Sequence, residues 1–104
     1  ASTSRVRDGF FLTHEDFLTP TTMHYRDEAG TLTHIKSLPA RFDASRLESE
    51  QCWAVSKDGT KIPYYVIRAK ELPSDGSTPT LLYGYGGFEV SLLPSYLSLA
   101  GPAW

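Results

Sequence analysis

The sequence has little of several features that define common protein classes. Its single cysteine, Cys52, excludes an intramolecular disulfide framework and a cysteine-based zinc site. No apolar run approaches the roughly 20 residues that a membrane-spanning helix needs. The 10 Lys and Arg residues against 12 Asp and Glu leave a net charge of −2. That balance gives no electrostatic basis for binding nucleic acid or an anionic membrane surface.

Signature motifs of catalysis are also scarce. The chain contains no Gly-x-Ser-x-Gly nucleophile elbow and no Gly-Lys-Ser/Thr phosphate loop. Gly84-x-Gly86 begins like a dinucleotide fingerprint, but Glu89 stands where the third glycine belongs, so we reject that interpretation. The sequence therefore predicts no nucleotide cofactor, and no other cofactor motif is present.

Histidine and cysteine are too sparse to indicate a metal centre. His14, His24 and His34 recur at intervals of ten residues, and we interpret them as loop and strand-surface histidines. Cys52 lies in a predicted strand, where a small buried core residue is the expected role. We predict no metal site.

The composition is that of an ordinary globular chain. Hydrophobic residues make up 40% and charged residues 21% of the 104 residues, a length typical of one domain. Residues 1–5 contain neither an initiator Met nor an apolar stretch like a signal peptide. The apolar tail, residues 94–104, ends without a capping or stop signal, so we expect a piece of a longer protein.

Strand signals dominate the first half of the chain. Residues 21–26 and 31–36 flank Asp27-Glu28-Ala29-Gly30 and predict a hairpin, and residues 9–12 predict a further strand. The segment from Ser37 to Ser49 contains Pro39 and no alternating pattern, which predicts a linker with one helical turn after Asp43.

The clearest local signal is a second hairpin. Residues 51–56 and 61–68 are rich in β-branched and aromatic side chains and flank a connection containing Asp58-Gly59. The second strand is apolar on both faces, so we expect both to be covered. Pro63 lacks a backbone donor and favours an edge position.

A short strand at 80–83 is predicted to run into Gly84-Tyr85-Gly86-Gly87-Phe88. Ligands often bind at loops that follow strands of open α/β sheets, and α/β-hydrolases place an oxyanion donor after their third strand. A glycine-rich β-turn with core aromatics is equally compatible with the chemistry alone. We expect Tyr83 to be a core residue.

Several motifs in order resemble the prolyl oligopeptidase family of serine peptidases over nearly the whole chain. They are Phe17-Leu18-Thr19-Pro20, Phe42-Asp43-Ala44-Ser45, Ser56-Lys57-Asp58-Gly59-Thr60-Lys61-Ile62-Pro63, Asp75-Gly76-Ser77 and Leu81-Leu82-Tyr83-Gly84-Tyr85-Gly86-Gly87-Phe88. The final Gly86-Gly87-Phe88 is closest to the proline-cleaving branch of the family.

The resemblance implies a mainly β fragment that joins a β-propeller to an α/β-hydrolase domain. Residues 1–38 would be the last propeller-blade strands and 39–49 the linker between domains. Residues 50–104 would be the first three strands of the truncated peptidase domain and the start of the following helix. The catalytic triad of such an enzyme would lie beyond Trp104, so the isolated chain is expected to be inactive.

Two site residues follow from the resemblance. Tyr85 matches the family tyrosine that helps to hold the oxyanion, and Phe88 matches an aromatic wall of the proline pocket, within a loop containing Gly84, Gly86 and Gly87. The implied parent is a cytoplasmic or periplasmic peptidase acting on proline-containing oligopeptides, without a cofactor. The alternative is a non-catalytic β-rich binding or self-assembling module.

The resemblance also predicts exposed apolar surface in this chain. Later strands and helices would normally cover Trp53, Tyr65, Ile67 and Leu82, so we expect these residues to leave an apolar patch or edge. Self-association, by edge pairing or by exchange of residues 94–104, is the expected consequence.

Overall fold

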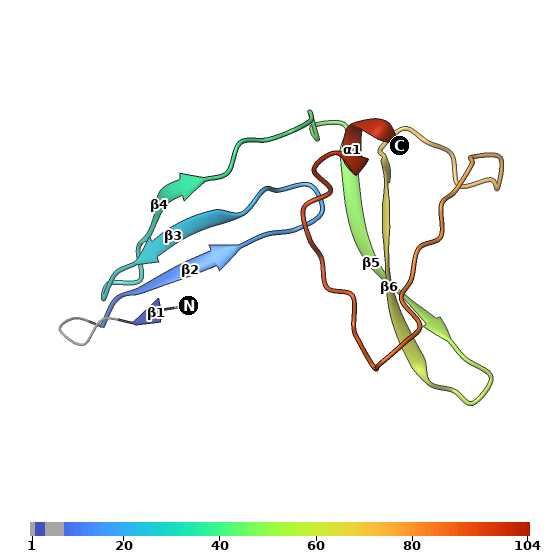
Figure 1. Cartoon of the computed structure of the whole chain (residues 1–104), viewed down its shortest axis with the longest axis horizontal. Helices are drawn as coiled ribbons and strands as arrows, with labels where there is room; N and C mark the ends of the chain where they lie inside the picture. The colour runs from blue at the N-terminus through green and yellow to red at the C-terminus, as the bar shows by residue number, and fades with distance from the viewer. Residues whose placement is uncertain (1, 4–7) are drawn as a thin grey trace. The chain divides into compact units, whose positions relative to one another are not determined.

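The computed structural model describes residues 2–3 and 8–104 of the chain. They form two antiparallel sheets and a short helix (Figure 1). The first sheet contains β1 (Ser2–Thr3), β2 (Phe10–His14), β3 (Thr22–Arg26) and β4 (Leu32–Ser37), in that order. The second contains β5 (Leu47–Val55) and β6 (Lys61–Ala69), and α1 comprises Ala100–Ala103.

The chain divides into two compact units. Unit 1 comprises residues 1–43 and 94–104, and unit 2 comprises residues 44–93. Unit 2 is therefore inserted into unit 1 in sequence. β5 begins at Leu47, inside the segment expected to be a linker. The expected helical turn after Asp43 is replaced by a tight turn, in which the Leu47 N–H donates to the Ala44 carbonyl at 3.0 Å. The division into propeller and hydrolase parts stays a prediction.

The first hairpin confirms the expected turn between β3 and β4. Gly30 adopts a φ of 88° and donates to the Asp27 carbonyl at 3.0 Å, while Asp27 N–H donates to the Thr31 carbonyl at 3.1 Å. The Asp27 side chain accepts the Thr31 N–H at 2.8 Å. A glycine tolerates this left-handed conformation without a Cβ clash, which explains why the four-residue connection ends on Gly30.

Aromatic and cationic side chains pair across the first sheet. On one face the rings of Phe11 and Tyr25 lie 5.2 Å apart, and Tyr25 covers Gly9, where a Cβ would overlap its ring. On the other face the Arg26 guanidinium lies 5.9 Å from the centre of the Phe10 ring. Cross-strand pairs of this kind stabilise a sheet by roughly 0.2–1 kcal/mol each.

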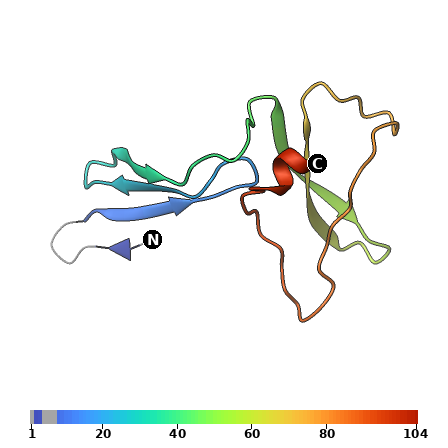
Figure 2. The same ribbon diagram turned by 45° about the horizontal axis from the view of Figure 1, so that its top comes forward.

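The second hairpin also forms as predicted, with nine residues in each strand and register from Leu47↔Ala69 to Val55↔Lys61 (Figure 2). Gly59, at a φ of 86°, donates to the Ser56 carbonyl at 3.0 Å. The Ser56 hydroxyl and then the Thr60 backbone N–H donate to Asp58 and lower the pKa of its carboxyl to about 2. The Asp58-Gly59 turn is thus held by its own side chains.

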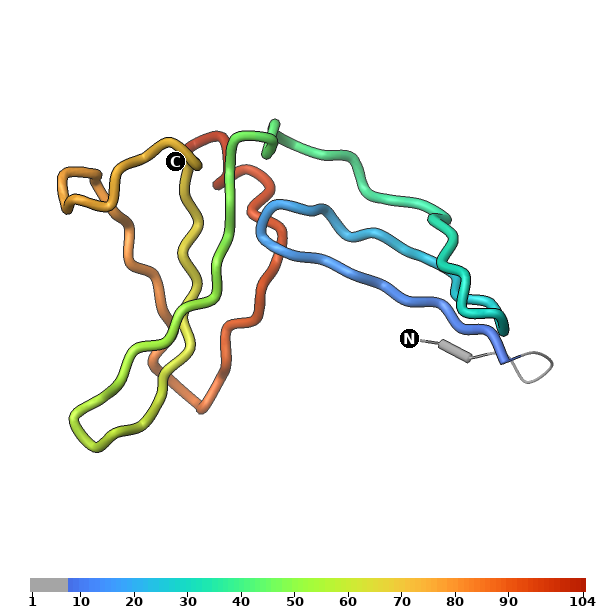
Figure 3. The backbone as a smooth tube through the Cα atoms, turned by 180° about the vertical axis from the view of Figure 1, so that it is seen from behind, coloured from blue at the N-terminus to red at the C-terminus, as the bar shows by residue number. Residues whose placement is uncertain are grey.

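The expected strand at 80–83 is not formed. Residues 79–86 have no regular secondary structure and belong to a long connection after β6 (Figure 3). A strand needs a neighbouring backbone to pair with, and no described residue supplies one here. The structure therefore contains two of the three strands that the resemblance implied for residues 50–104.

Little of the apolar surface is buried. Among the described residues no hydrophobic side chain is fully buried, and Thr22 is the buried polar residue at 8% exposure. The predicted core roles of Tyr83 and Cys52 are therefore wrong for this chain, because Tyr83 is 77% exposed and Cys52 only half-buried. In β6, residues 61–64 are exposed and 65–69 half-buried, so the covering expected for both faces does not come from the described residues.

Candidate functional site

The glycine-rich loop lies in unit 2, in the connection that follows β6. Its turn falls at Phe88 and Glu89 and is closed by Val90 N–H donating to the Gly87 carbonyl at 3.2 Å. Phe88 and Glu89 have φ values of 55° and 53°, in the left-handed region that non-glycine residues rarely adopt. Two such residues in succession store backbone strain of the order of 1–3 kcal/mol each.

The three glycines of the loop do not form its turn. Gly84, Gly86 and Gly87 all lack a positive φ, whereas Phe88 and Glu89 have one. A Cβ at Gly84 or Gly86 would meet nothing within 4 Å, and one at Gly87 would make an ordinary 3.7 Å contact with the Tyr85 ring. Gly84 and Gly86 leave one side of the loop backbone bare, because no described atoms lie where their side chains would be.

Tyr85 and Phe88 are both accessible. Tyr85 is 51% exposed and Phe88 is 92% exposed. Within the described part of the chain the Tyr85 hydroxyl has no hydrogen-bond partner, while the ring lies against Gly87. The loop can therefore offer a phenolic donor and a flat apolar ring to a partner, since neither group is used for packing inside unit 2.

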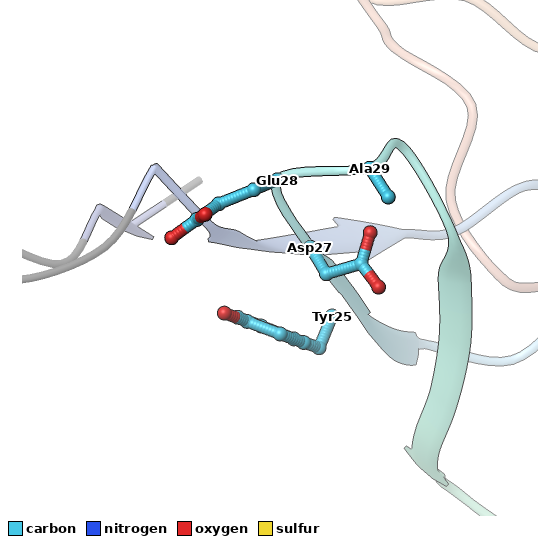
Figure 4. A pocket seen from close by; sticks show the side chains of 4 residues that line it. All are labelled: Tyr25, Asp27, Glu28 and Ala29. Carbon is cyan, nitrogen blue, oxygen red and sulfur yellow. The ribbon is translucent and has the colours of Figure 1, made fainter.

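A cavity of about 520 Å³ lies elsewhere, at the turn between β3 and β4, lined by Tyr25, Asp27, Glu28 and Ala29 (Figure 4). Figure 4 shows the Tyr25 hydroxyl and the Glu28 carboxylate pointing to the same side, whereas the Asp27 carboxylate turns away. Asp27 is occupied in the turn by the Thr31 N–H, so the two carboxylates do not converge. The cavity is not part of the predicted site.

The histidines take up structural positions. His24 and His34 are cross-strand partners with ring centres 5.6 Å apart. His34 Nε2 also lies 2.7 Å from the Ser37 hydroxyl. His14 Nε2 lies 3.3 Å from the Asp16 carboxylate. No three potential metal ligands gather among the residues that the structure describes. Residues 2–3 and 8–104 include no helix with the length and apolar character to cross a bilayer.

One set of contacts was not anticipated from the sequence. Glu15, Phe42 and Tyr96 meet in unit 1, although Glu15 and Tyr96 are 81 positions apart. Neither residue belongs to a periodic pattern or a turn motif that would predict the contact, because such patterns report only on residues close together in the sequence. The motif Phe42-Asp43-Ala44-Ser45 carries the family resemblance, but it gives no indication of the contact between Phe42 and Tyr96.

Known proteins similar to this chain are peptidases. An uncharacterized peptidase of Sinorhizobium fredii, y4nA, is 47% identical over 98 residues, which is 93% of this chain. A prolyl endopeptidase of Elizabethkingia meningoseptica is 35% identical over 96% of the chain. A dual function macrocyclase-peptidase of Galerina marginata is 39% identical over 84% of the chain. No family model matches the sequence.

Solved structures agree with the sequence relatives. A prolyl endopeptidase structure, from work on inter-domain dynamics in catalysis and specificity, aligns with a TM-score of 0.76 at 31% identity over 91% of the chain. Prolyl oligopeptidase B from Galerina marginata aligns with a TM-score of 0.74 at 35% identity, also over 91%. The chain spans only 13–14% of the length of these relatives and 14% of these structures.

Proposed function

Because this chain belongs to the prolyl oligopeptidase family, of which it spans a short segment, we propose that it carries part of the active site of a serine-type peptidase that cleaves oligopeptides after proline. In this proposal Tyr85 stabilises the oxyanion and Phe88 forms one wall of the proline pocket. The observation that carries it is the joint exposure of both side chains in one short loop (51% and 92%).

The proposed role of Tyr85 uses the chemistry of its hydroxyl. During peptide hydrolysis negative charge builds up on the carbonyl oxygen, and a donor placed at that oxygen stabilises the transition state more than the ground state. A free phenolic O–H in a loop with a bare backbone side suits this task, because no internal acceptor competes for the hydroxyl. The glycines allow a substrate backbone to approach closely.

The proposed role of Phe88 depends on its flat apolar ring. Proline has a rigid pyrrolidine ring that buries apolar surface well against an aromatic face and requires no polar partner there. The left-handed backbone at Phe88 and Glu89 forms the turn that carries the ring, and the described residues leave the ring 92% exposed. Strained backbone of this kind concentrates at ligand-binding positions.

The remaining catalytic groups would come from other parts of the whole protein. Acyl transfer requires a nucleophile and a base, and the 104 residues contain no nucleophile elbow. From the family resemblance we propose that residues 1–38 form the last propeller-blade strands, 39–49 the linker and 50–104 the first part of the peptidase domain. The substrates would be proline-containing oligopeptides, handled in the cytoplasm or periplasm.

The test is made in the full-length protein that contains this segment. Tyr85→Phe should lower kcat on a proline-containing peptide amide with little change in KM, whereas the isolated chain should show no hydrolysis. Activity of the repurified chain that a serine-directed phosphonate blocks would contradict the proposal that the triad lies elsewhere.

A second candidate function has support from the exposed apolar residues. Leu82 is 94% and Trp53 57% exposed, while Tyr65 and Ile67 are half-buried. Such surface would be covered by the remainder of a peptidase domain, or by a second copy if the chain is a self-assembling β-rich module. An activity that requires Tyr85 in a longer protein favours the peptidase, since a self-assembling module would need neither the hydroxyl nor a nucleophile.

A further inference from the structure

Three segments of unit 1 that are distant in sequence meet at Tyr96. The Tyr96 backbone N–H donates to Glu15 Oε1 at 2.8 Å, and the Leu97 N–H donates to the Phe17 carbonyl at 3.1 Å. The Tyr96 hydroxyl accepts the Arg41 backbone N–H at 2.7 Å. Figure 3 shows residues 94–104, in orange and red, beside the blue connection that joins β2 to β3.

Phe42 adds an apolar contact to these hydrogen bonds. Its ring stacks on the Tyr96 ring with centres 5.4 Å apart and planes inclined by 7°. The ring also lies against Gly101 in α1, where an added Cβ would overlap with it. Phe42 is half-buried as a result, in a chain whose hydrophobic side chains are mostly exposed.

Both oxygens of Glu15 are engaged. Oε1 accepts the Tyr96 N–H, and Oε2 accepts the Thr21 hydroxyl at 2.5 Å. The Thr21 hydroxyl and then the Tyr96 N–H lower the pKa of Glu15, because both hydrogen bonds favour the carboxylate. Hydrogen bonds to an ionised acceptor are roughly twice as strong as neutral ones.

The position of this cluster in the chain is informative. Unit 2 comprises residues 44–93, so Phe42 lies two residues before its beginning and Tyr96 three residues after its end. The Phe42–Tyr96 stack therefore holds the outgoing and returning chain side by side within unit 1. Closing a loop of this length has an entropic cost, and the contacts must offset it for the two ends to stay together.

We propose that Glu15, Phe42 and Tyr96 form a clamp that fastens the two ends of the inserted unit 2 at one point, with Tyr96 as the positioning residue. When the clamp is closed, the chain that carries Tyr85 and Phe88 is anchored on its C-terminal side at Tyr96. When it opens, residues 94–104 are released from unit 1. The clamp is independent of the roles proposed for Tyr85 and Phe88, because none of its contacts involves them.

Amide hydrogen exchange of the 104-residue chain tests the clamp. We expect the Tyr96 and Leu97 amides to be protected, in contrast to those of Leu92 and Leu93. Tyr96→Phe removes the acceptor of the Arg41 amide and should speed exchange there by about threefold to tenfold, the range for a lost hydrogen bond. Glu15→Gln should speed exchange at Tyr96 by a similar factor, since a neutral acceptor is weaker.

Matched controls remove the same groups elsewhere. Tyr64→Phe deletes an exposed hydroxyl in β6, and Glu28→Gln neutralises an exposed carboxylate at the β3–β4 turn, so neither should change exchange at Tyr96. Equal exchange at Leu93 and Leu97 in the unmodified chain would overturn the clamp. Unchanged protection in both clamp variants would overturn it as well.

A second measurement tests the clamp independently, in case Tyr96→Phe or Glu15→Gln prevents folding. With Cys52→Ser as background, cysteines in place of Arg41 and Leu97, which leave the three clamp side chains intact, should oxidise to a disulfide faster than cysteines in place of Arg41 and Leu93. Equal oxidation rates for the two pairs would show that the ends of unit 2 are not held together at Tyr96, and the proposal would be wrong.

Discussion

Replacing Tyr85 with Phe tests the proposed oxyanion role, because the change removes the hydroxyl and keeps the ring. The ring belongs to a residue that is 51% exposed, and the variant keeps the ring unchanged. The hydroxyl has no hydrogen-bond partner among the described residues, so its removal leaves no buried donor or acceptor unsatisfied. The stability of the protein should change by no more than about 0.5 kcal/mol, as for other exposed positions.

The expected effect on catalysis is much larger. Loss of one oxyanion donor costs about 2.7–4 kcal/mol of transition-state stabilisation, which lowers kcat by about 10²–10³. Ground-state binding hardly uses the hydroxyl, so KM should stay within about threefold. A stability change of 0.5 kcal/mol or less, by contrast, alters a folded fraction near unity by a negligible amount.

The assay is steady-state hydrolysis of a slow proline-containing peptide amide by the full-length protein, so that acylation limits the rate. Thermal unfolding of the same samples measures any loss of fold. Tyr64→Phe serves as the matched control, because it removes an exposed tyrosine hydroxyl from β6 and should leave kcat unchanged. If Tyr85→Phe keeps kcat within about twofold of the unmodified enzyme, Tyr85 is not an oxyanion donor.

Four further outcomes are expected. Phe88→Ala should raise KM for proline substrates and reduce discrimination against other residues by about 1–3 kcal/mol, measured as a ratio of kcat/KM values; unchanged discrimination would exclude the pocket role. Gly59→Ala should speed amide exchange across β5 and β6 by about fivefold, because a φ of 86° costs an L-residue about 1 kcal/mol. Gly84→Ala should leave this exchange unchanged, since Gly84 has no positive φ. The hydrogen bonds from the Thr21 hydroxyl and the Tyr96 N–H hold the pKa of Glu15 below the ordinary value of a glutamate, so its contribution to the clamp is present above that ordinary value and is lost as pH falls through the lowered pKa. The protection factor of the Tyr96 amide should fall in that pH range, and Glu15→Gln should abolish this pH dependence. Light scattering of the 104-residue chain at high micromolar concentration should show species larger than a monomer, because Trp53 is 57% exposed, and a sharp monomer peak would contradict this.

Local chemistry determined the two hairpins. Gly30 and Gly59 take the left-handed conformation that each connection requires, and the neighbouring aspartates accept backbone N–H groups from within the same turn. All partners of these bonds lie within five residues of one another, so the sequence alone predicts them. The glycine-rich loop could be identified in the same way as a site candidate, from its composition and from a resemblance.

Tertiary structure decided the features whose partners are distant. Residues 80–83 have a strand-like pattern, but a strand forms only when another backbone accepts and donates its hydrogen bonds, and the described residues provide none there. The Glu15–Tyr96 contact could not be read from either segment, because each residue is an unremarkable member of its own connection. The turn of the candidate loop likewise lies at Phe88 and Glu89 and not at the neighbouring glycines, although glycine tolerates a positive φ best, so composition alone does not locate it.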